Sequence, residues 1–195
     1  MLAALRSWTG VRAGVYLARN SSQDRPARSL PLITLYLTER CNSRCVSCEY
    51  WRHGRADMTP ESVTALLPAL ERLGTKVVLI SGGEPLIHPQ WVEIAETLRT
   101  GGRALWLLTS GLSLVKHAAR AAALFQSITV SLDGIDRPMY AAIRGLDAFE
   151  KVCAGIKRLR PAARTWASES RCSGAITLTC PPSLSSRAGD RKSVV

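Results

Sequence analysis

Residues 32–48 read LITLYLTERCNSRCVSC, a short apolar run followed by a loop with three cysteines. The run 32–38 is rich in Leu, Ile and Thr, which predicts a buried β-strand. Cys41, Cys45 and Cys48 follow at spacings of four and three positions. A structural zinc site needs four ligands, and a disulfide framework needs an even number of cysteines. Three thiols directly after a strand therefore indicate a site with one position left to another ligand.

Downstream of this loop, predicted helices alternate with predicted strands. Thr59, Pro60 and Gly74 are residue types typical of an N-cap, a first helical position and a helix end. Further strand-like runs and helical patterns follow closely: strands at 76–81, 104–110 and 127–134, and helices at 88–102, 112–125 and 145–159. These four β–α units predict an α/β fold with a parallel sheet, open or curled toward a barrel, and right-handed crossovers.

Each polar motif of this region lies where a predicted strand ends. The cysteine loop follows the first strand, and the others follow or end the next three: SGGEP at 81–85, TSG at 109–111 and SLDG at 131–134. The carboxyl ends of parallel strands meet at one edge of the sheet, where α/β folds place their sites. We therefore expect these motifs to form one site.

The composition predicts a single domain with a sizeable core. The chain has 195 residues, of which 46% are hydrophobic and 21% charged. No apolar run approaches the roughly 20 residues that span a bilayer, and Arg6 and Arg12 interrupt the apolar stretch that a signal peptide would need. We expect a cytoplasmic protein with free thiols and no membrane partner.

The net charge of +11 does not point to nucleic acid as a partner. Residues 1–30 carry +4 and residues 161–195 carry +3, which leaves only +4 for the 130 residues between them. The basic residues of this middle region are scattered and have no interleaved aromatic residues, unlike a nucleic-acid-binding face.

The three thiols admit three interpretations. A cubane iron–sulfur cluster can bind three thiolates and leave its fourth iron open, whereas zinc would take His53 as a fourth ligand. Zinc ligands usually form two separated pairs, and no second pair stands near this loop. The third interpretation is an iron–sulfur electron carrier, but carriers usually hold their cluster with four cysteines.

Taken together, the motifs resemble the radical S-adenosylmethionine (SAM) superfamily. The resemblance rests on Cys41-x3-Cys45-x2-Cys48 after the first strand and on Gly82-Gly83-Glu84-Pro85 after the second. The SLDG motif and Tyr140…Ile143-Arg144-Gly145 are similar to the branch with the molybdenum-cofactor cyclase and the peptide-modifying maturases. The resemblance covers about residues 30–160 and implies a partial (β/α)6 barrel, of which about four β–α units are present.

The resemblance implies a [4Fe–4S] cluster on Cys41, Cys45 and Cys48, with SAM bound at the open iron. An electron from a donor such as flavodoxin or ferredoxin would cleave SAM to methionine and a 5′-deoxyadenosyl radical. This radical would take a hydrogen atom from a peptide or a small molecule such as a cofactor precursor. The protein would orient SAM and exclude water.

The resemblance also implies SAM contacts. Ser47 would approach the adenine through its backbone, and Gly82 and Gly83 would let the chain pass close to SAM, where a Cβ would intrude. The backbone of the Glu84-Pro85 turn would contact the methionine amino group. The other implied contacts follow the third and fourth strands: Ser110, where the family often has Asn; Ser131 and Arg144, for the ribose or carboxylate; and Asp133, as a neighbour.

Plainer interpretations of these residues stay open. The Gly-Gly-Glu-Pro segment could be only a tight turn, Ser131 could only end a strand, and Arg144 could be a solvated charge on a helix. Tyr50 and Trp51 could shield the cluster or pack in the core. Cys153 lies among apolar residues of a predicted helix, so we expect an ordinary buried thiol.

The chain divides into three predicted regions: a basic extension at 1–30, a core at 31–160 and a tail at 161–195. In the tail the β–α pattern stops, and Ser, Arg and Pro dominate. We interpret it as a frameshifted or artefactual, disordered segment and assign no ligand role to Cys172 or Cys180. The expected barrel would be incomplete and leave an open sheet edge. We therefore expect this chain to be an inactive fragment of an active enzyme.

Overall fold

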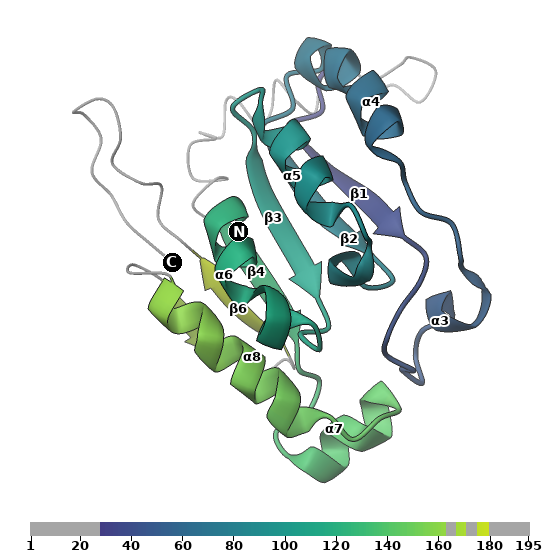
Figure 1. The fold of residues 1–195 in the computed structure, drawn as a ribbon, viewed down its shortest axis with the longest axis vertical. Helices are drawn as coiled ribbons and strands as arrows, with labels where there is room; N and C mark the ends of the chain where they lie inside the picture. The colour runs from purple at the N-terminus through teal and green to yellow at the C-terminus, as the bar shows by residue number, and fades with distance from the viewer. Residues whose placement is uncertain (1–27, 163–166, 171–174, 180–195) are drawn as a thin grey trace.

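A parallel sheet forms the centre of the molecule. The structure is a computed structural model that describes residues 28–162, 167–170 and 175–179. Four strands pair in chain order and in parallel (Figure 1): β1 (Leu32–Thr38), β2 (Val77–Gly82), β3 (Ala104–Thr109) and β4 (Ser127–Ser131). The predicted α/β fold with four β–α units is confirmed.

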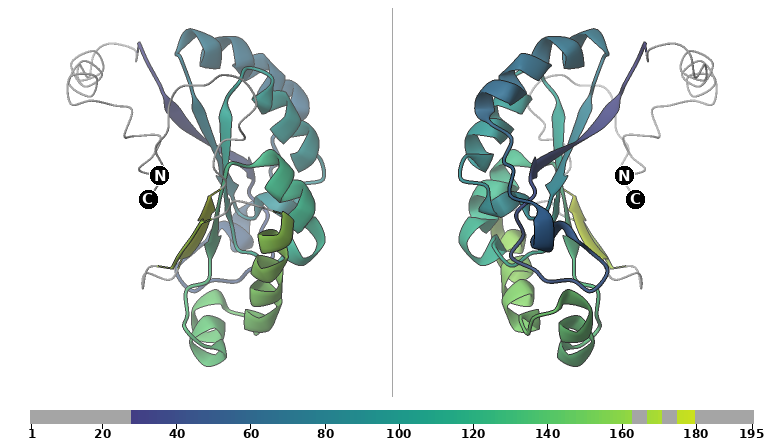
Figure 2. Two further views of the ribbon diagram at one scale, coloured as in Figure 1. Left: turned by 90° about the vertical axis from the view of Figure 1, so that its left-hand side faces the viewer. Right: turned by 90° about the vertical axis from the view of Figure 1, so that its right-hand side faces the viewer.

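The long helices cover one face of this sheet (Figure 2): α4 (Pro60–Arg72), α5 (Trp91–Arg99), α6 (Leu114–Leu124) and α8 (Phe149–Ala162). Thr59 is the N-cap of α4, as predicted, because its Oγ1 accepts a hydrogen bond from the N–H of Ser62 at 3.2 Å. No helix in the described part of the chain is both long and apolar enough to cross a bilayer.

The core lies between the sheet and these helices. Along β3 the burial alternates: Leu105, Leu107 and Thr109 are buried, whereas Trp106 and Leu108 stay half-exposed. Successive side chains of a strand point to opposite faces, so the alternation marks the face that the helices cover. Apolar residues recurring along the helices complete this core: Val63, Leu70, Trp91, Ile94, Leu98, Leu114, Ala118, Ala121, Leu124, Val152, Ile156 and Leu159.

Short elements lie beyond the carboxyl ends of the strands: α3 (Tyr50–His53), the 3₁₀ turn η1 (Pro85–Ile87) and α7 (Arg137–Arg144). Helix α7 carries the motif that ends in Arg144, and its bounds were not among the helices predicted from the sequence. Its start signal is present, since Asp136 accepts a hydrogen bond from the N–H of Met139 at 2.9 Å and Pro138 stands in the first turn.

The predicted tail contains two strands. β5 (Ala167–Ser170) and β6 (Ala175–Thr179) pair antiparallel, and β6 pairs antiparallel with β4. The expectation of disorder throughout 161–195 therefore differs from the structure at these strands and at the end of α8. Without β6, β4 would be an edge strand with unpaired N–H and C=O groups. The β-branched run AITLT forms β6 and pairs with these groups.

The limits of the predicted regions stay predictions. Residues 1–27 of the predicted extension lie outside the described residues, as do 163–166, 171–174 and 180–195 of the predicted tail. Cys172 and Cys180 fall in these ranges.

Replacing Leu105 by Ala tests the position of the core. Leu105 is fully buried between β3 and the helices, so L105A should lower the free energy of unfolding by about 2–5 kcal/mol. The matched control is L32A, because Leu32 is 40% exposed, and its effect should be about 1 kcal/mol or less. Urea denaturation measures both, and equal losses would contradict this position of the core.

Candidate functional site

The three cysteines of the loop after β1 are free thiols: Cys45 is buried, and Cys41 and Cys48 are half-buried. Burial raises the pKa of the Cys41 and Cys45 thiols. Neighbouring thiolates raise the pKa further, Cys45 acting on Cys41 and Cys48 acting on Cys45, whereas the Arg144 guanidinium lowers it for both. The loop thus holds interacting thiols beside a cation.

The donor set of this loop fits an iron–sulfur cluster. Within the described residues, no three His, Cys, Asp or Glu side chains are grouped as they would be around one metal ion. A cubane takes each thiolate at a different iron, so its ligands need not converge on one point. Beside these thiols, the buried Ser43 Oγ, Tyr140 Oη and Arg144 Nε have no hydrogen-bond partner among the described residues. The side chain of His53, the fourth ligand of the zinc interpretation, lies outside the described part.

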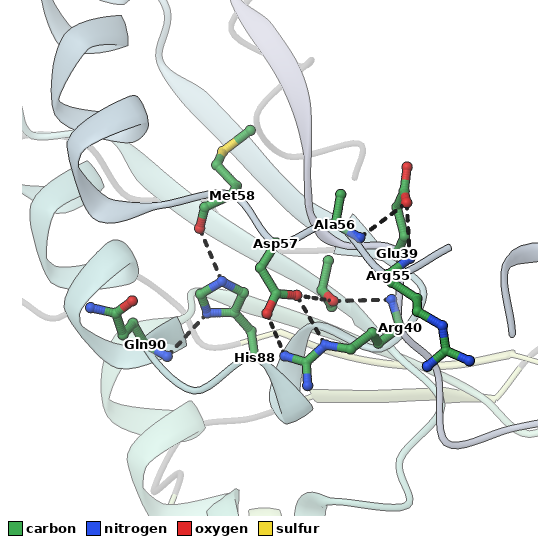
Figure 3. Close-up of polar contacts among 9 residues, drawn as sticks. Glu39, Arg40, Arg55, Ala56, Asp57, Met58, His88 and Gln90 are labelled. Carbon is green, nitrogen blue, oxygen red and sulfur yellow. Dashed lines mark hydrogen bonds and ion pairs between the residues drawn. The ribbon is translucent and has the colours of Figure 1, made fainter. Parts of the chain in front are cut away.

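Asp57 binds the two residues that lead from β1 into the cysteine loop, Thr38 and Arg40 (Figure 3). Its carboxylate accepts hydrogen bonds from Thr38 Oγ1 at 2.6 Å and from Arg40 Nε and Nη2 at 3.1 and 2.5 Å. The N–H of Arg40 donates to Thr38 Oγ1 at 3.0 Å, and Thr38 and Asp57 form an isolated antiparallel bridge. Partial burial acts to raise the pKa of Asp57, but the hydrogen bonds from Thr38 and Arg40 outweigh it and lower that pKa.

Hydrogen bonds of Glu39 and His88 connect residues 55–58 to the end of β1 and to the start of α5. Glu39 Oε2 accepts from the N–H groups of Arg55 and Ala56, each at 3.1 Å (Figure 3). The buried ring of His88 bridges the returning chain to the start of α5. Its Nδ1 accepts from the Gln90 N–H at 3.1 Å, so Nε2 carries the proton and donates to the Met58 carbonyl at 3.0 Å.

The end of α7 holds the middle of the cysteine loop. The N–H groups of Arg44 and Val46, which flank Cys45, donate to the carbonyls of Arg144 and Ile143 at 3.1 and 3.0 Å. Gly145 follows with φ of 71°, and a Cβ there would stand 2.1 Å from the Arg44 carbonyl oxygen. The backbone around Cys45 therefore packs directly against the end of α7.

Arg144 is buried beside this contact. Its Nη1 donates to Asp133 Oδ2 at 3.0 Å, and only 8% of the residue is exposed. The interpretation of Arg144 as a solvated charge is therefore wrong. Asp133 itself has φ of 50°, a conformation uncommon outside glycine.

Glu84 joins the ends of β2 and β3 through its side chain. The residue is fully buried, and its Oε1 accepts from the N–H of Leu86 at 3.1 Å and from Thr109 Oγ1 at 2.7 Å. Its Oε2 accepts from the N–H and the hydroxyl of Ser110 at 2.7 and 2.5 Å. The carboxylate of the Gly-Gly-Glu-Pro segment is thus a structural link, so the segment is more than a tight turn.

Ser110 connects Glu84 to the cysteine loop, because it contacts both Glu84 and Asn42. Its Oγ lies 3.3 Å from the Asn42 amide oxygen, and the Asn42 Nδ2 lies 3.2 Å from Ser113 Oγ. A hydroxyl has one proton, and the Glu84 carboxylate can only accept, so the proton of Ser110 goes to Glu84. The Asn42 amide then fits better when turned over, donating to Ser110 and accepting from Ser113.

Gly82 and Gly83 allow β2 to meet the start of the cysteine loop. Gly82 has φ of 132°, and a Cβ there would lie 2.4 Å from the Thr38 carbonyl oxygen. At Gly83 a Cβ would lie 2.2 Å from the Arg40 carbonyl oxygen, which accepts from the Glu84 N–H. The glycines therefore have a structural reason in this contact, and their approach to SAM stays a prediction.

The other predicted residues lie at the same edge of the sheet. Ser131 is half-exposed at the end of β4, Pro85 is buried at the start of η1, and Ser47 is exposed in the cysteine loop. Their contacts with SAM stay predictions. Trp51 Nε1 donates to the Cys45 carbonyl at 3.2 Å, and Tyr50 stacks on Tyr36 with ring centroids 6.0 Å apart.

Two features lie away from this edge. Cys153 on α8 is half-buried rather than buried as predicted, and burial raises the pKa of its thiol. A cavity of about 380 Å³ opens between the loops that precede β2 and β3, lined in part by Lys76 and Arg103. It therefore belongs to the opposite, amino end of the strands.

Sequence reasoning missed Arg40, Asn42 and Asp57. Each acts through a partner far along the chain, and the only sequence signal was their position in or beside the cysteine loop.

Fold and site together define an α/β protein of barrel type with a thiol-rich site at the carboxyl ends of its strands. The family model for the Radical SAM superfamily matches residues 35–167. The chain belongs to the Radical SAM superfamily, and the resemblance seen in the sequence is confirmed. Membership implies a [4Fe–4S] cluster and SAM.

Individual relatives agree with this assignment. The chain is 34% identical over 140 residues to the probable GTP 3′,8-cyclase of Pyrococcus abyssi, covering 69% of this chain and 45% of that protein. It is 36% identical over 151 residues to the GTP 3′,8-cyclase of Mycobacterium marinum, covering 73% and 42%. The chain thus spans less than half the length of these curated relatives.

Solved structures share the fold. The crystal structure of Streptococcus suis SuiB bound to precursor peptide SuiA has a TM-score of 0.61 at 17% identity, covering 78% of this chain and 35% of that chain. SuiB bound to S-adenosylmethionine has a TM-score of 0.61 at 16% identity, covering 76% and 34%.

Replacing Glu84 by Gln should destabilise the protein although the side chains have the same shape. Each Glu84 oxygen faces one backbone N–H and one hydroxyl, so either placement of the Gln amide sets an NH₂ group against a backbone donor. We expect a loss of about 2–3 kcal/mol in the free energy of unfolding. Urea denaturation measures this, with E93Q on the exposed side of α5 as control; equal stability of E84Q and the parent would contradict the link.

Replacing Asp57 by Asn should change the pH dependence of stability. The pKa of Asp57 is lowered by folding, so its carboxylate stabilises the fold above the unfolded pKa of about 3.9, and this contribution is lost as pH falls through the folded pKa. D57N should therefore be less stable than the parent at pH 7, and the difference should shrink below about pH 4. Denaturation across this range provides the measurement; a difference that does not depend on pH would contradict the assignment.

Proposed function

We propose that this chain is the cluster- and SAM-binding part of a radical SAM enzyme, with Cys41, Cys45 and Cys48 as the cluster ligands. The observation that carries the proposal is the arrangement of the cysteine loop. Its three free thiols stand at the carboxyl ends of the strands and are held there by Asp57, α7 and the end of β2. When bound, the cluster supplies the electron that cleaves SAM to methionine and a 5′-deoxyadenosyl radical.

The chain's own residues would bind and orient SAM. The backbone of Gly82 to Pro85 would face the methionine amino group, with Glu84 fixing the turn from behind. Arg144 already pairs with Asp133 but has an unpartnered Nε, so it has donors left for a carboxylate or a ribose. Ser131, at the half-exposed end of β4, is placed to add a hydroxyl. Ser47 would present its backbone to the adenine, and Ser110 would support the loop.

We propose a small cofactor precursor, rather than a peptide, as the substrate. Curated relatives at 31–36% identity are named for a reaction of GTP, whereas the likeness to the peptide-binding SuiB is 17% in sequence. A flavodoxin or ferredoxin would supply the electron. A cytoplasmic location is also part of this proposal, because free thiols persist in reducing compartments.

We further propose that the 195-residue chain alone binds its cofactors but does not turn over substrate. It spans 40–45% of the length of the GTP 3′,8-cyclases it matches. The second face of its sheet, with Trp106 and Leu108, is half-exposed, although a closed barrel would enclose that face around the substrate.

Anaerobic reconstitution with iron and sulfide tests the ligand set. The parent chain should take up about four irons and four sulfides and turn brown. C41A, C45A and C48A should each lose most of this iron, while C153A, the matched control on α8, should keep it. Equal iron in all four variants, or binding of zinc in place of the cluster, would refute the assignment of the ligands.

Formation of 5′-deoxyadenosine then tests the reaction. With SAM and dithionite, the reconstituted chain should cleave SAM only slowly, and GTP should not accelerate the cleavage. The absence of any reductant-dependent 5′-deoxyadenosine would favour an electron carrier over an enzyme. Acceleration by GTP would contradict the inactivity of the chain by itself.

A further inference from the structure

The hydroxyl of Tyr140 is a buried proton donor without an acceptor. Tyr140 lies on α7 and is fully buried, and its Oη has no hydrogen-bond partner among the described residues. A buried hydroxyl left unpaired costs about 1–3 kcal/mol, so native structures rarely keep one without a reason. Its ring is well anchored, since it meets Phe149 edge to face with centroids 5.9 Å apart.

The neighbours of Tyr140 along α7 face the cysteine loop. Residues three and four positions apart share one face of a helix, so Tyr140 lies on the same side as Ile143 and Arg144. The carbonyls of these two residues accept the N–H groups on either side of Cys45. Cys45 is also the buried cysteine of the three. Tyr140 is therefore a buried residue of the helix that packs against the backbone on both sides of Cys45.

Other groups near the hydroxyl do not take its proton. A guanidinium is a donor only, so the nearby Arg144 cannot accept from Tyr140. The Asp133 carboxylate accepts from Arg144 at 3.0 Å and has no hydrogen bond with Tyr140. The Tyr140 hydroxyl therefore keeps a proton for which no acceptor stands among the described residues.

We propose that Tyr140 is a positioning residue that donates its hydroxyl proton to sulfur at the Cys45 corner of the bound cluster. The inference rests on the proposed function, because it requires a cluster on Cys45. Hydrogen bonds to the sulfurs of a cluster stabilise its reduced, more negative state and raise its reduction potential. Tyr140 would thus set how easily the cluster accepts the electron that SAM cleavage consumes.

Replacing Tyr140 by Phe separates this role from a structural one. Y140F removes only the oxygen, so the metal-free variant should be as stable as the parent or more stable, because an unpaired buried hydroxyl is lost. In the reconstituted chain, the equilibrium constant for reduction should fall about tenfold, which for one electron lowers the potential by about 59 mV. Y36F is the matched control, because Tyr36 is 53% exposed on β1; it should leave the potential unchanged.

The measurement is a redox titration followed by electron paramagnetic resonance. Pulsed experiments on the reduced parent in D₂O should also show an exchangeable hydrogen coupled to the cluster, lost in Y140F and kept in Y36F. A parent that assembles no cluster would refute the proposed function and this inference together. A normal cluster whose potential is the same in Y140F and the parent would overturn this inference alone, as would a metal-free Y140F clearly less stable than the parent.

Discussion

The buried carboxylate of Glu84 is the interaction on which the rest of the site depends. It is fully buried and held by four hydrogen bonds from Leu86, Thr109 and Ser110. A buried carboxyl group is tolerated only when fixed donors replace its water. The donors here come from the ends of two neighbouring strands, so the side chain ties β2 to β3 where the site lies. Through Ser110 and Asn42, the same link reaches the cysteine loop.

The cysteine loop is ordered by contacts at three separate places rather than by its own secondary structure. Asp57 closes its base, α7 holds the backbone at Cys45, and Gly82 and Gly83 let β2 press against its start. Ordering a loop costs conformational entropy for every residue fixed, and here contacts with three other segments offset that cost. The backbone of the loop is thereby ordered by its neighbours, which would limit the reorganisation that binding of the proposed cluster requires.

Sequence reasoning recovered the features that local signals encode. The β1–β4 strands and the long helices follow from periodicity, and the start of α4 from Thr59 and Pro60. The side-chain role of Glu84 was missed because its partners Thr109 and Ser110 lie 25 and 26 positions away. The hydrogen bond between Thr38 and Asp57 spans 19 positions, and no local sequence pattern predicts it. The pairing of β6 with β4 likewise depends on which sheet edge is free, and only the assembled sheet shows that edge. Local propensity therefore placed the elements and their ends, while long-range polar contacts decided how those ends are joined.

The polar groups left unpaired are concentrated where the chain would meet its cofactors. Among the described residues, the buried side-chain atoms without partners are Ser43 Oγ, Arg103 Nε, Tyr140 Oη and Arg144 Nε, and three of these four belong to the cysteine loop or to α7. Packing alone would favour satisfying them, since each unpaired group weakens the fold. Elsewhere at this edge the chain does satisfy its buried polar groups, with Glu84 as the extreme case. The same edge therefore combines two kinds of polar group. The Glu84 carboxyl group has all its hydrogen bonds and holds the strands together, whereas Ser43, Tyr140 and Arg144 have polar atoms left for a ligand. Glu84 thus builds the site, whereas the unpaired groups of Tyr140 and Arg144 would contact what the site binds.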